Sequence, residues 1–222
     1  MQDNRTVHPL DQLYNIVNDL WGAAPVAGEA EPPVRRVEKP APAKEPEPSF
    51  PPFEQFWRTA DETVDWTDAL AMDHPTDGMT SPALWSFFHS HAEAVLRGDI
   101  PAYVEVLKAA NPLGDLLPYA QAFNVKAQNA DQLTVTFEGL PRYLNTDAPE
   151  RRRYLAGICL RTARDLMALL PVCNVDVSAC DQGRELLRVD FSRQELQKVR
   201  FSFVEPVQFV KDCGGVYAED EA

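Results

Sequence analysis

The chain has 222 residues, of which 34 are acidic, 21 are basic and 45% are hydrophobic, and its formal net charge is −13. This length accommodates about one ordinary domain and an additional segment. Binding along nucleic acid needs clustered Lys and Arg, so the acidic balance argues against a protein that grips nucleic acid over its whole surface. We find no signal-peptide pattern and no apolar run long enough to span a membrane, and therefore expect a cytoplasmic protein without a membrane partner.

Residues 22–52 are predicted to be a disordered linker. Nine of the 19 prolines lie in this segment, and its apolar side chains are almost all Ala and Val. Such a segment cannot bury enough apolar surface to offset the entropy lost on ordering it. Because proline-rich chains are extended, this linker would allow the residues on its two sides to lie far apart.

Residues 1–21 are predicted to be an amphipathic helical segment, with the helix over residues 9–21. Its apolar side chains recur at spacings of three and four and share one face. They are Leu10, Leu13, Tyr14, Val17, Leu20 and Trp21. A helix this short is marginal alone in water, so we expect this face to dock on another surface. That surface is either the chain's own domain or another protein, and the sequence leaves both alternatives open.

Residues 53–73 contain six acidic side chains, one Arg and several large aromatic residues. Acidic segments with aromatic residues occur as docking motifs, but aromatic residues at helical spacing more often lie in the core of their own domain. We therefore expect Phe53, Phe56, Trp57 and Trp66 to belong to the core of a single domain over residues 53–216.

Within this domain, helices and strand pairs are predicted to alternate. Apolar spacings of three and four predict helices over residues 82–97, 101–110, 149–170 and 193–200 and from Pro206 onward, and strict alternation predicts strands near residues 123–127, 133–137, 175–177 and 187–191. Short turns within each strand pair indicate antiparallel pairing. The predicted fold class is α+β, with an antiparallel sheet of about four strands and helices packed over one face. Residues 217–222 are predicted to be a frayed acidic tail.

The sequence predicts no catalytic residues, no metal and no cofactor. The motifs GxSxG, GxxxxGK[ST] and GxGxxG are absent, so we favour a protein that is not an enzyme, with a hydrolase of unrecognised site as a weaker alternative. All four His precede residue 92 and all four Cys follow residue 158, which excludes the close Cys/His pairs of zinc sites. We expect free thiols, with a Cys173–Cys180 disulfide as the alternative.

The carboxylates near the last predicted strands invite a comparison with metal-dependent nucleases. Asp176 and Asp190, together with Glu185, Glu195 and Lys198, are the residue types that such nucleases use. The Glu-x-Lys spacing of those enzymes is missing, and carboxylates are common on protein surfaces. We therefore favour ordinary surface positions for these residues.

Basic side chains concentrate in the last part of the chain. Residues 1–140 hold 9 basic and 21 acidic side chains, whereas residues 141–222 hold 12 and 13, and ten of those 12 are Arg. Arginine makes planar, bidentate contacts with anions. The favoured interpretation is an internal ion-pair network, such as Arg161 with Asp165, and the alternative is an anion-binding site. The candidate anion-binding residues are Arg151, Arg152, Arg153, Arg164 and Arg193.

Four stretches of the C-terminal half share a further pattern. They are CLRTARDLMALLPV at 159–172, LRVDFSR at 187–193, FVEP at 203–206 and NPLGDLLPY at 111–119. This pattern resembles a bacterial family of uncharacterised proteins, which generally has Asp where this chain has Glu205. The resemblance implies no activity and no catalytic residue.

These observations favour an intracellular, non-enzymatic interaction protein. In this interpretation an α+β domain carries, on a proline-rich tether, an N-terminal helix that docks on a partner protein. The alternative is an arginine-rich domain that binds anions, with nucleic acid as a less favoured ligand.

Overall fold

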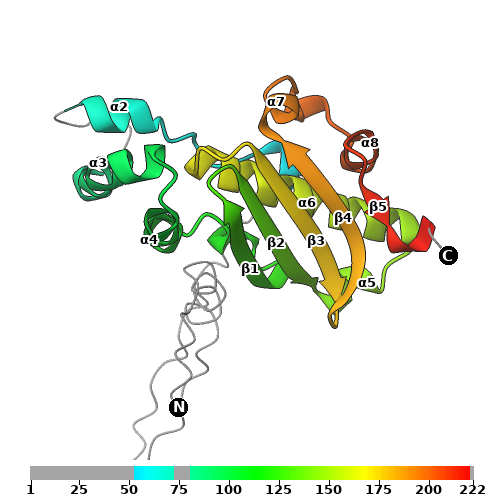
Figure 1. Ribbon diagram of the computed structural model, residues 1–222. Helices are drawn as coiled ribbons and strands as arrows, with labels where there is room; N and C mark the ends of the chain where they lie inside the picture. The colour runs from blue at the N-terminus through cyan, green and yellow to red at the C-terminus, as the bar shows by residue number, and fades with distance from the viewer. Residues whose placement is uncertain (1–52, 73–80, 221–222) are drawn as a thin grey trace, which may run out of the picture.

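The computed structural model describes residues 53–72 and 81–220. These residues form an α+β fold with a five-stranded sheet and seven helices, so the α+β part of the predicted fold class is confirmed (Figure 1). The predicted amphipathic segment 1–21 and the predicted linker 22–52 lie outside the described residues.

The elements follow one another in the order helices, strand pair, long helix, strand pair and short helices. The helices are α2 (Trp66–Ala71), α3 (Pro82–Leu96), α4 (Ile100–Ala110), α5 (Pro141–Leu144), α6 (Ala148–Leu169), α7 (Arg193–Leu196) and α8 (Pro206–Asp212). The strands are β1 (Ala120–Asn129), β2 (Gln132–Gly139), β3 (Asn174–Asp181), β4 (Arg184–Ser192) and β5 (Val216–Tyr217). Short 3-10 helices are η2 (Phe53–Arg58), η3 (Gly114–Leu116), η4 (Phe201–Phe203) and η5 (Ala218–Asp220).

The sheet differs from the predicted antiparallel sheet of about four strands, because it has five strands and is mixed. Its order is β1-β2-β3-β4-β5, and β2 and β3 are parallel while the other neighbouring pairs are antiparallel. The parallel pair arises because α6 returns the chain to the end of the sheet at which β2 begins. The fifth strand pairs through Val216 and Tyr217 alone, which is too short to give an alternating pattern in the sequence.

Helix α6 is the centre of the core. It packs against β3 and β4 on one side and against η2 on another, and 15 of its 22 residues are buried. Asp147 caps its N-terminus by accepting a hydrogen bond from the N–H of Glu150. Gly157 allows η2 to approach closely, since a Cβ at this position would lie 2.9 Å from Cε3 of Trp57. Helix α6 is therefore apolar on more than one face, as expected for a central helix.

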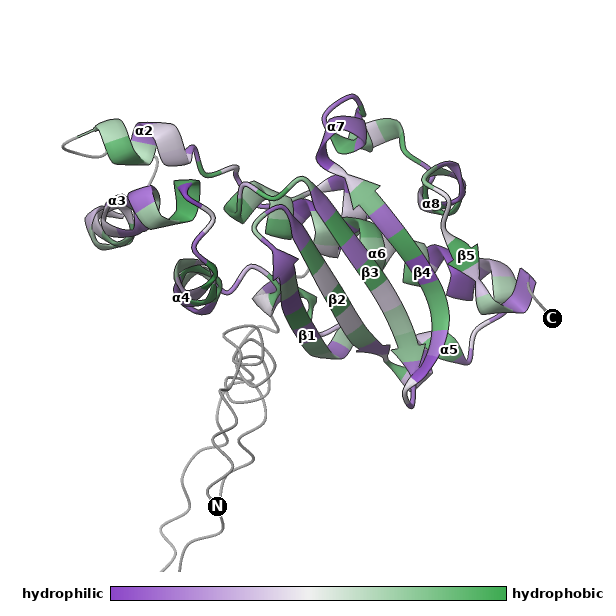
Figure 2. Ribbon diagram, in the orientation of Figure 1, coloured by the Kyte–Doolittle hydropathy of each residue, from purple (hydrophilic) through white to green (hydrophobic). Residues whose placement is uncertain are grey.

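Strands β2 and β4 alternate between core side chains and more exposed ones, which Figure 2 shows as bands of contrasting colour along β4. In β2, Leu133, Val135 and Phe137 are buried, and Thr134 and Thr136 between them are only half-buried. Helix α6 runs behind the sheet in the view of Figure 1. This alternation gives the sheet one apolar face and one polar face.

The residues after Tyr217 differ from the predicted frayed tail. Ala218–Asp220 form η5, and Glu219 and Asp220 make ion pairs with Arg151 and Arg152 of α6. Tyr217 itself is buried. The ordered domain therefore extends beyond the predicted boundary at residue 216, because these carboxylates have cationic partners far away in the sequence.

In the part of the chain that the structure describes, no helix has the length and apolar character needed to cross a membrane.

Candidate functional site

An extended segment, residues 59–65, lies along the C-terminal half of α6. The backbone N–H of Asp61 donates to Oδ1 of Asp165 over 2.9 Å, and that of Val64 donates to the carbonyl of Ala168 over 2.8 Å. The Ala168 carbonyl is one of the last four of α6, which have no partner within the helix. The segment is thus fixed in place by groups of α6 that require hydrogen-bond donors.

Helix α2 follows this segment and is held by contacts with α6 and α3. Asp65 caps its first turn, and the indole Nε1 of Trp66 donates to the carbonyl of Leu169 over 2.7 Å. From α3, Nδ1 of His89 donates to the carbonyl of Ala69 over 2.7 Å. A helix of six residues is not stable alone, so these contacts determine its position.

A hollow of about 540 Å³ lies beside α2, α3 and the extended segment. We call it the acidic groove, and its lining residues are Asp61, Glu62, Thr63, Val64, Asp65, Asp68, Ala69, Met72, Ser81, Leu84, Trp85, Phe88, Ala110, Pro112 and Leu169. Its volume lies within the range of protein sites that bind small molecules or side chains.

One wall of the acidic groove is apolar. Leu84 keeps 36% of its surface exposed, Trp85 is half-buried and Phe88 is buried. The ring of Trp85 stacks on His89 with 4.9 Å between the centroids, and Phe88 packs edge-on against Trp66. These contacts hold the rings in fixed orientations and leave apolar surface of Leu84 and Trp85 accessible to a ligand.

The other wall carries carboxylates. Glu62, Asp65 and Asp68 are exposed and form no ion pair within the described residues. Asp61 is the exception, since one of its oxygens lies 3.7 Å from Nη2 of Arg161. Burial raises the pKa of Asp61, Arg161 opposes this shift, and Asp115 adds to it. The acidic groove therefore combines negative charge with accessible apolar surface.

A buried charged cluster adjoins this wall. Arg161, which is 5% exposed, pairs with Asp165 at 2.5 Å and with Asp115 at 2.9 Å, so the predicted Arg161–Asp165 pair is confirmed. Burial raises the pKa of Asp165 to about 7, against the charge and hydrogen bond of Arg161 and the N–H of Asp61. The cluster connects α6 to the extended segment and to η3, and its carboxylates outnumber its single guanidinium group.

Three of the predicted anion-binding residues lie near the N-terminus of α6, and each has a carboxylate partner. Arg151 pairs with Glu219, and Arg152 pairs with both Glu219 and Asp220. The third, Arg153, lies 3.7 Å from Glu205. These three arginines therefore belong to an internal ion-pair network, which is the interpretation that the sequence favoured.

Arg193 binds backbone carbonyls at the end of α6. Its Nε donates to the carbonyl of Val172 over 2.7 Å, and its Nη2 donates to the carbonyls of Met167 over 2.7 Å and Leu170 over 2.6 Å. Burial lowers the pKa of Arg193. Since the last carbonyls of a helix carry partial negative charge, this guanidinium group serves as a C-terminal cap of α6.

Arg164 likewise binds carbonyl groups. Its Nη1 donates to the carbonyls of Trp57 and Thr59, and its guanidinium carbon lies 3.6 Å from the ring centroid of Phe201. Burial lowers its pKa to about 10, so it stays charged at neutral pH. This residue joins α6 to the end of η2 and to η4.

The five predicted anion-binding arginines do not form one site. Arg152 and Arg164 are 12 residues apart on α6, which corresponds to about 18 Å. Arg164 and Arg193 line a hollow of about 310 Å³ beside Phe201, at a distance along the helix from the other three. The structure therefore divides the candidate residues into a group near the start of α6 and a pair near its end.

The structure also shows where the carboxylates that were compared with nuclease residues lie, and the state of the four cysteines. Asp176 and Asp190 lie opposite each other on β3 and β4, and Asp176 pairs with Arg188 at 2.5 Å. Burial raises the pKa of Asp190, and the Asp176 charge adds to this shift. Within residues 53–72 and 81–220, no three His, Cys, Asp or Glu side chains are grouped so as to hold a metal ion. All four cysteines are free, Cys173 and Cys180 included.

Sequence reasoning missed the acidic groove. It correctly predicted that Phe56, Trp57 and Trp66 lie in the core, since all three are buried, whereas the side chain of Phe53 lies outside the described part of the structure. The unusual number of acidic residues at 53–73 was the one signal in the sequence that pointed to this groove. Its apolar wall belongs to α3, a separate segment that begins after residue 81. The groove could be located only when the relative position of these two segments was known.

Comparisons with protein-family models, with curated proteins and with solved structures gave no match to this chain. The resemblance of residues 159–193 to a bacterial family of uncharacterised proteins stays a prediction. Fold and groove together define an α+β protein in which a mixed sheet and a central helix support an acidic, partly apolar groove.

Proposed function

We propose that this protein is a protein-interaction module whose acidic groove binds a cationic, amphipathic segment of a partner protein. The observation that carries this proposal is that the accessible apolar surface of Leu84 and Trp85 lines the same groove as the carboxylates of Glu62 and Asp68, which have no ion-pair partner among the described residues. An amphipathic helix would bury its apolar side chains on the first wall and place Lys or Arg beside the second. Recognition of a helix in a groove proceeds in this way.

The lining of the acidic groove supports binding rather than catalysis. Its described residues provide carboxylates and two hydroxyl groups, those of Thr63 and Ser81, but no His, Cys or Lys. Oγ of Ser81 accepts a hydrogen bond from the N–H of Leu84 as the N-cap of α3. Nucleophilic catalysis needs a nucleophile activated by a base, and among the described residues neither Thr63 nor Ser81 is hydrogen-bonded to a carboxylate.

The amphipathic segment predicted at residues 9–21 is the second docking element of this proposal. Asp11 and Asp19 give this segment an acidic character, which the acidic groove would repel. We therefore favour docking of the segment on a partner protein, with residues 22–52 as the tether. A cytoplasmic location, predicted from the sequence, completes the proposal.

The proposal is tested by the affinity of the full chain for two fluorescein-labelled helical peptides. Both have Leu at helical spacing, but one has Lys and the other has Glu at the remaining positions. We expect the Lys peptide to bind, with an affinity that decreases as salt increases, because its partners are exposed carboxylates. The double variant Glu62→Lys/Asp68→Lys should weaken this binding by about tenfold or more. Asp181→Lys, a change of the same kind at the exposed last residue of β3, is the control and should have no effect.

Variant Trp85→Ala separates a specific groove from general attraction between opposite charges. Loss of the apolar wall should weaken binding of the Lys peptide while the carboxylates stay in place. Equal binding of the Lys and Glu peptides, or equal affinity of the Glu62→Lys/Asp68→Lys variant and the unchanged chain, would overturn the proposed function.

A further inference from the structure

Arg151 and Arg152 lie near the start of α6, at the opposite end of this helix from the acidic groove (Figure 1). The helix macrodipole disfavours cations near a helix N-terminus. Two neighbouring arginines at this position are therefore stabilised by negative partners. The structure places these partners on the segment Ala218–Asp220.

Contacts between this segment and the arginines involve charged groups and one ring. Glu219 bridges both guanidinium groups, since it pairs with Arg151 and lies 3.4 Å from Nε of Arg152. Asp220 pairs with Nη2 of Arg152, and the ring centroid of Tyr217 lies 4.9 Å from the guanidinium carbon of the same residue. The chain thus satisfies its own arginines with an acidic segment.

The ion pairs are shallow. The side chains of Glu219 and Asp220 keep 39% and 47% of their surface exposed, and those of Arg151 and Arg152 keep 25% and 22%. Ion pairs this accessible to water contribute little stability and are weakened by salt. Tyr217, buried in β5, anchors the chain just before the segment. Residues 218–220 could therefore leave the arginines while β5 stays paired.

A hollow of about 400 Å³ adjoins Arg152 and extends this surface. Its lining residues are Ala148, Pro149, Arg152, Arg153, Glu205 and Val207, and they do not include Ala218–Asp220. Arg153 keeps 52% of its side chain exposed and is held by Glu205 only at 3.7 Å. The chain's own acidic segment therefore covers only part of a surface that combines three arginines with an apolar hollow.

We propose that Arg151, Arg152 and Arg153, with the hollow beside them, bind an acidic peptide segment of another protein, and that Ala218–Asp220 occupies this site in cis. Carboxylates of the partner replace Glu219 and Asp220, and an apolar residue between them enters the hollow. Because a tethered segment has a high effective concentration, its presence lowers the apparent affinity for the partner. This surface is separate from the acidic groove and does not depend on the proposed function.

The test uses the full chain and a fluorescein-labelled peptide with the core Glu-Glu-Leu-Glu-Glu. Variant Glu219→Gln/Asp220→Asn removes the charges of the segment in cis and should raise the affinity for this peptide about tenfold, the effect expected from three partly exposed ion pairs. Addition of Arg151→Gln/Arg152→Gln to this variant should abolish the gain. Replacement of Leu by Ser in the peptide should weaken binding, because the hollow is apolar.

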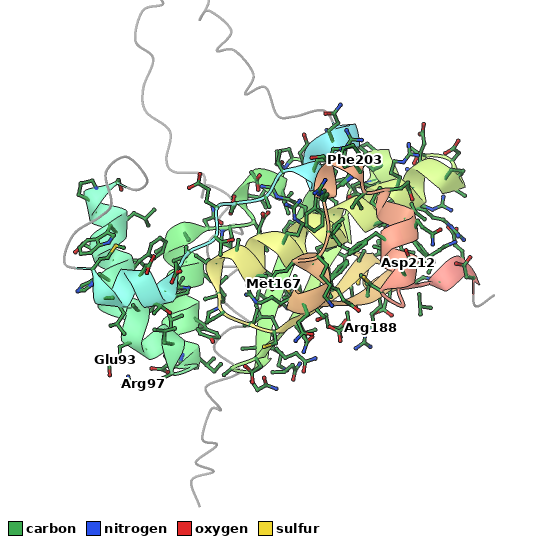
Figure 3. All side chains as sticks on the ribbon, turned by 90° about the horizontal axis from the view of Figure 1, so that it is seen from above. Glu93, Arg97, Met167, Arg188, Phe203 and Asp212 are labelled. Carbon is green, nitrogen blue, oxygen red and sulfur yellow. The ribbon has the colours of Figure 1, made fainter. Side chains whose placement is uncertain are left out.

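Variant Glu93→Gln is the control, since it removes a more exposed ion pair, with Arg97, at the far end of the molecule (Figure 3). It should bind the peptide as the unchanged chain does. Equal affinities of the Glu219→Gln/Asp220→Asn variant and the unchanged chain would overturn the proposal. The Glu219→Gln/Asp220→Asn variant could instead bind a short oligothymidylate more tightly than the unchanged chain does, without any gain for the peptide. In that case the proposed class of partner, an acidic peptide, would be wrong.

Discussion

The indole Nε1 of Trp66 donates a hydrogen bond to the backbone carbonyl of Leu169 over 2.7 Å, between residues 103 positions apart. This bond joins the first turn of α2 to the last residue of α6. It also satisfies one of the carbonyls that a helix leaves unpaired at its C-terminus. Since α2 forms part of the acidic groove, the bond makes the geometry of the groove dependent on the central helix.

Replacement of Trp66 by Phe should lower the free energy of unfolding by about 1–3 kcal/mol, because the buried carbonyl of Leu169 loses its donor. Urea unfolding measures this change, and peptide affinity of the groove should decrease in the same variant. The control is Trp57→Phe, whose indole Nε1 lies 3.4 Å from the carbonyl of Val204 and makes the weaker bond. If Trp57→Phe proved the more damaging change, the role assigned to Trp66 would be wrong.

Gly157→Ala should destabilise the protein, although the same change usually stabilises a helix. The added Cβ would lie 2.9 Å from Cε3 of Trp57 and 3.2 Å from Cζ of Phe56. Overpacking of this kind costs about 1–3 kcal/mol, which exceeds the gain of up to about 1 kcal/mol in helix propensity. A Gly157→Ala variant as stable as the unchanged chain in urea unfolding would show that η2 does not pack on α6 at this distance.

The buried carboxyl group of Asp165 predicts a pH dependence. Burial raises its pKa from 3.8 to about 7. The folded state then holds the proton more tightly than the unfolded state, so this group's contribution to stability is full below pH 4 and is lost as the pH rises through about 7. Relative to Asp165→Asn, the unchanged chain should therefore become less stable as the pH rises over this range.

Urea unfolding of both proteins between pH 4 and pH 8 measures this difference, and titrating groups that lie far from Asp165 cancel in the comparison. A gain in stability of the unchanged chain over Asp165→Asn with rising pH would contradict the expectation. Such a result would mean that Arg161 outweighs the effect of burial.

Arg193→Lys should lower the free energy of unfolding by about 2 kcal/mol or more, because an ammonium group cannot reproduce three donations in the plane of a guanidinium group. The acceptors are the carbonyls of Met167, Leu170 and Val172. Arg184→Lys, at the exposed first residue of β4, is the matched control and should change stability by no more than about 0.5 kcal/mol. Equal stabilities of the two variants in thermal unfolding would refute the capping role of Arg193.

Local signals made much of the fold predictable. The sequence predicted a helix over residues 149–170, and α6 covers Ala148–Leu169, because Asp147 and Pro149 mark its start and Pro171 marks its end. Alternating apolar residues identified four of the five strands in the same manner. These features depend on near neighbours in the chain and can be read without tertiary structure.

Other features depend on contacts between distant residues. The parallel pairing of β2 and β3 follows from the path of α6, which no local pattern encodes. Arg164 and Arg193 have apolar neighbours in the sequence, which is consistent with their partial burial. Their ligands are backbone carbonyls, however, and side-chain patterns do not reveal which carbonyls lack donors. Glu219 pairs with Arg151, which lies 68 residues earlier in the chain.

Phe203 illustrates a further limit of pattern analysis. It stands in an apolar run near Phe201, yet 85% of its surface is exposed, and it lies at the edge of the molecule (Figure 3). The ring of Phe201, two residues earlier, contacts Arg164. The two positions differ because η4 is a single turn, so only one of the two rings can face α6.

Photo-crosslinking tests the central claim, the binding of a cationic amphipathic segment in the acidic groove. The Lys peptide described above would carry a benzophenone group in place of one Leu, and mass spectrometry would locate its cross-links on the full chain. The account predicts cross-links at Met72, Leu84 or Trp85, and their loss in Glu62→Lys/Asp68→Lys. Cross-links on the polar face of the sheet that persist in this variant would contradict it.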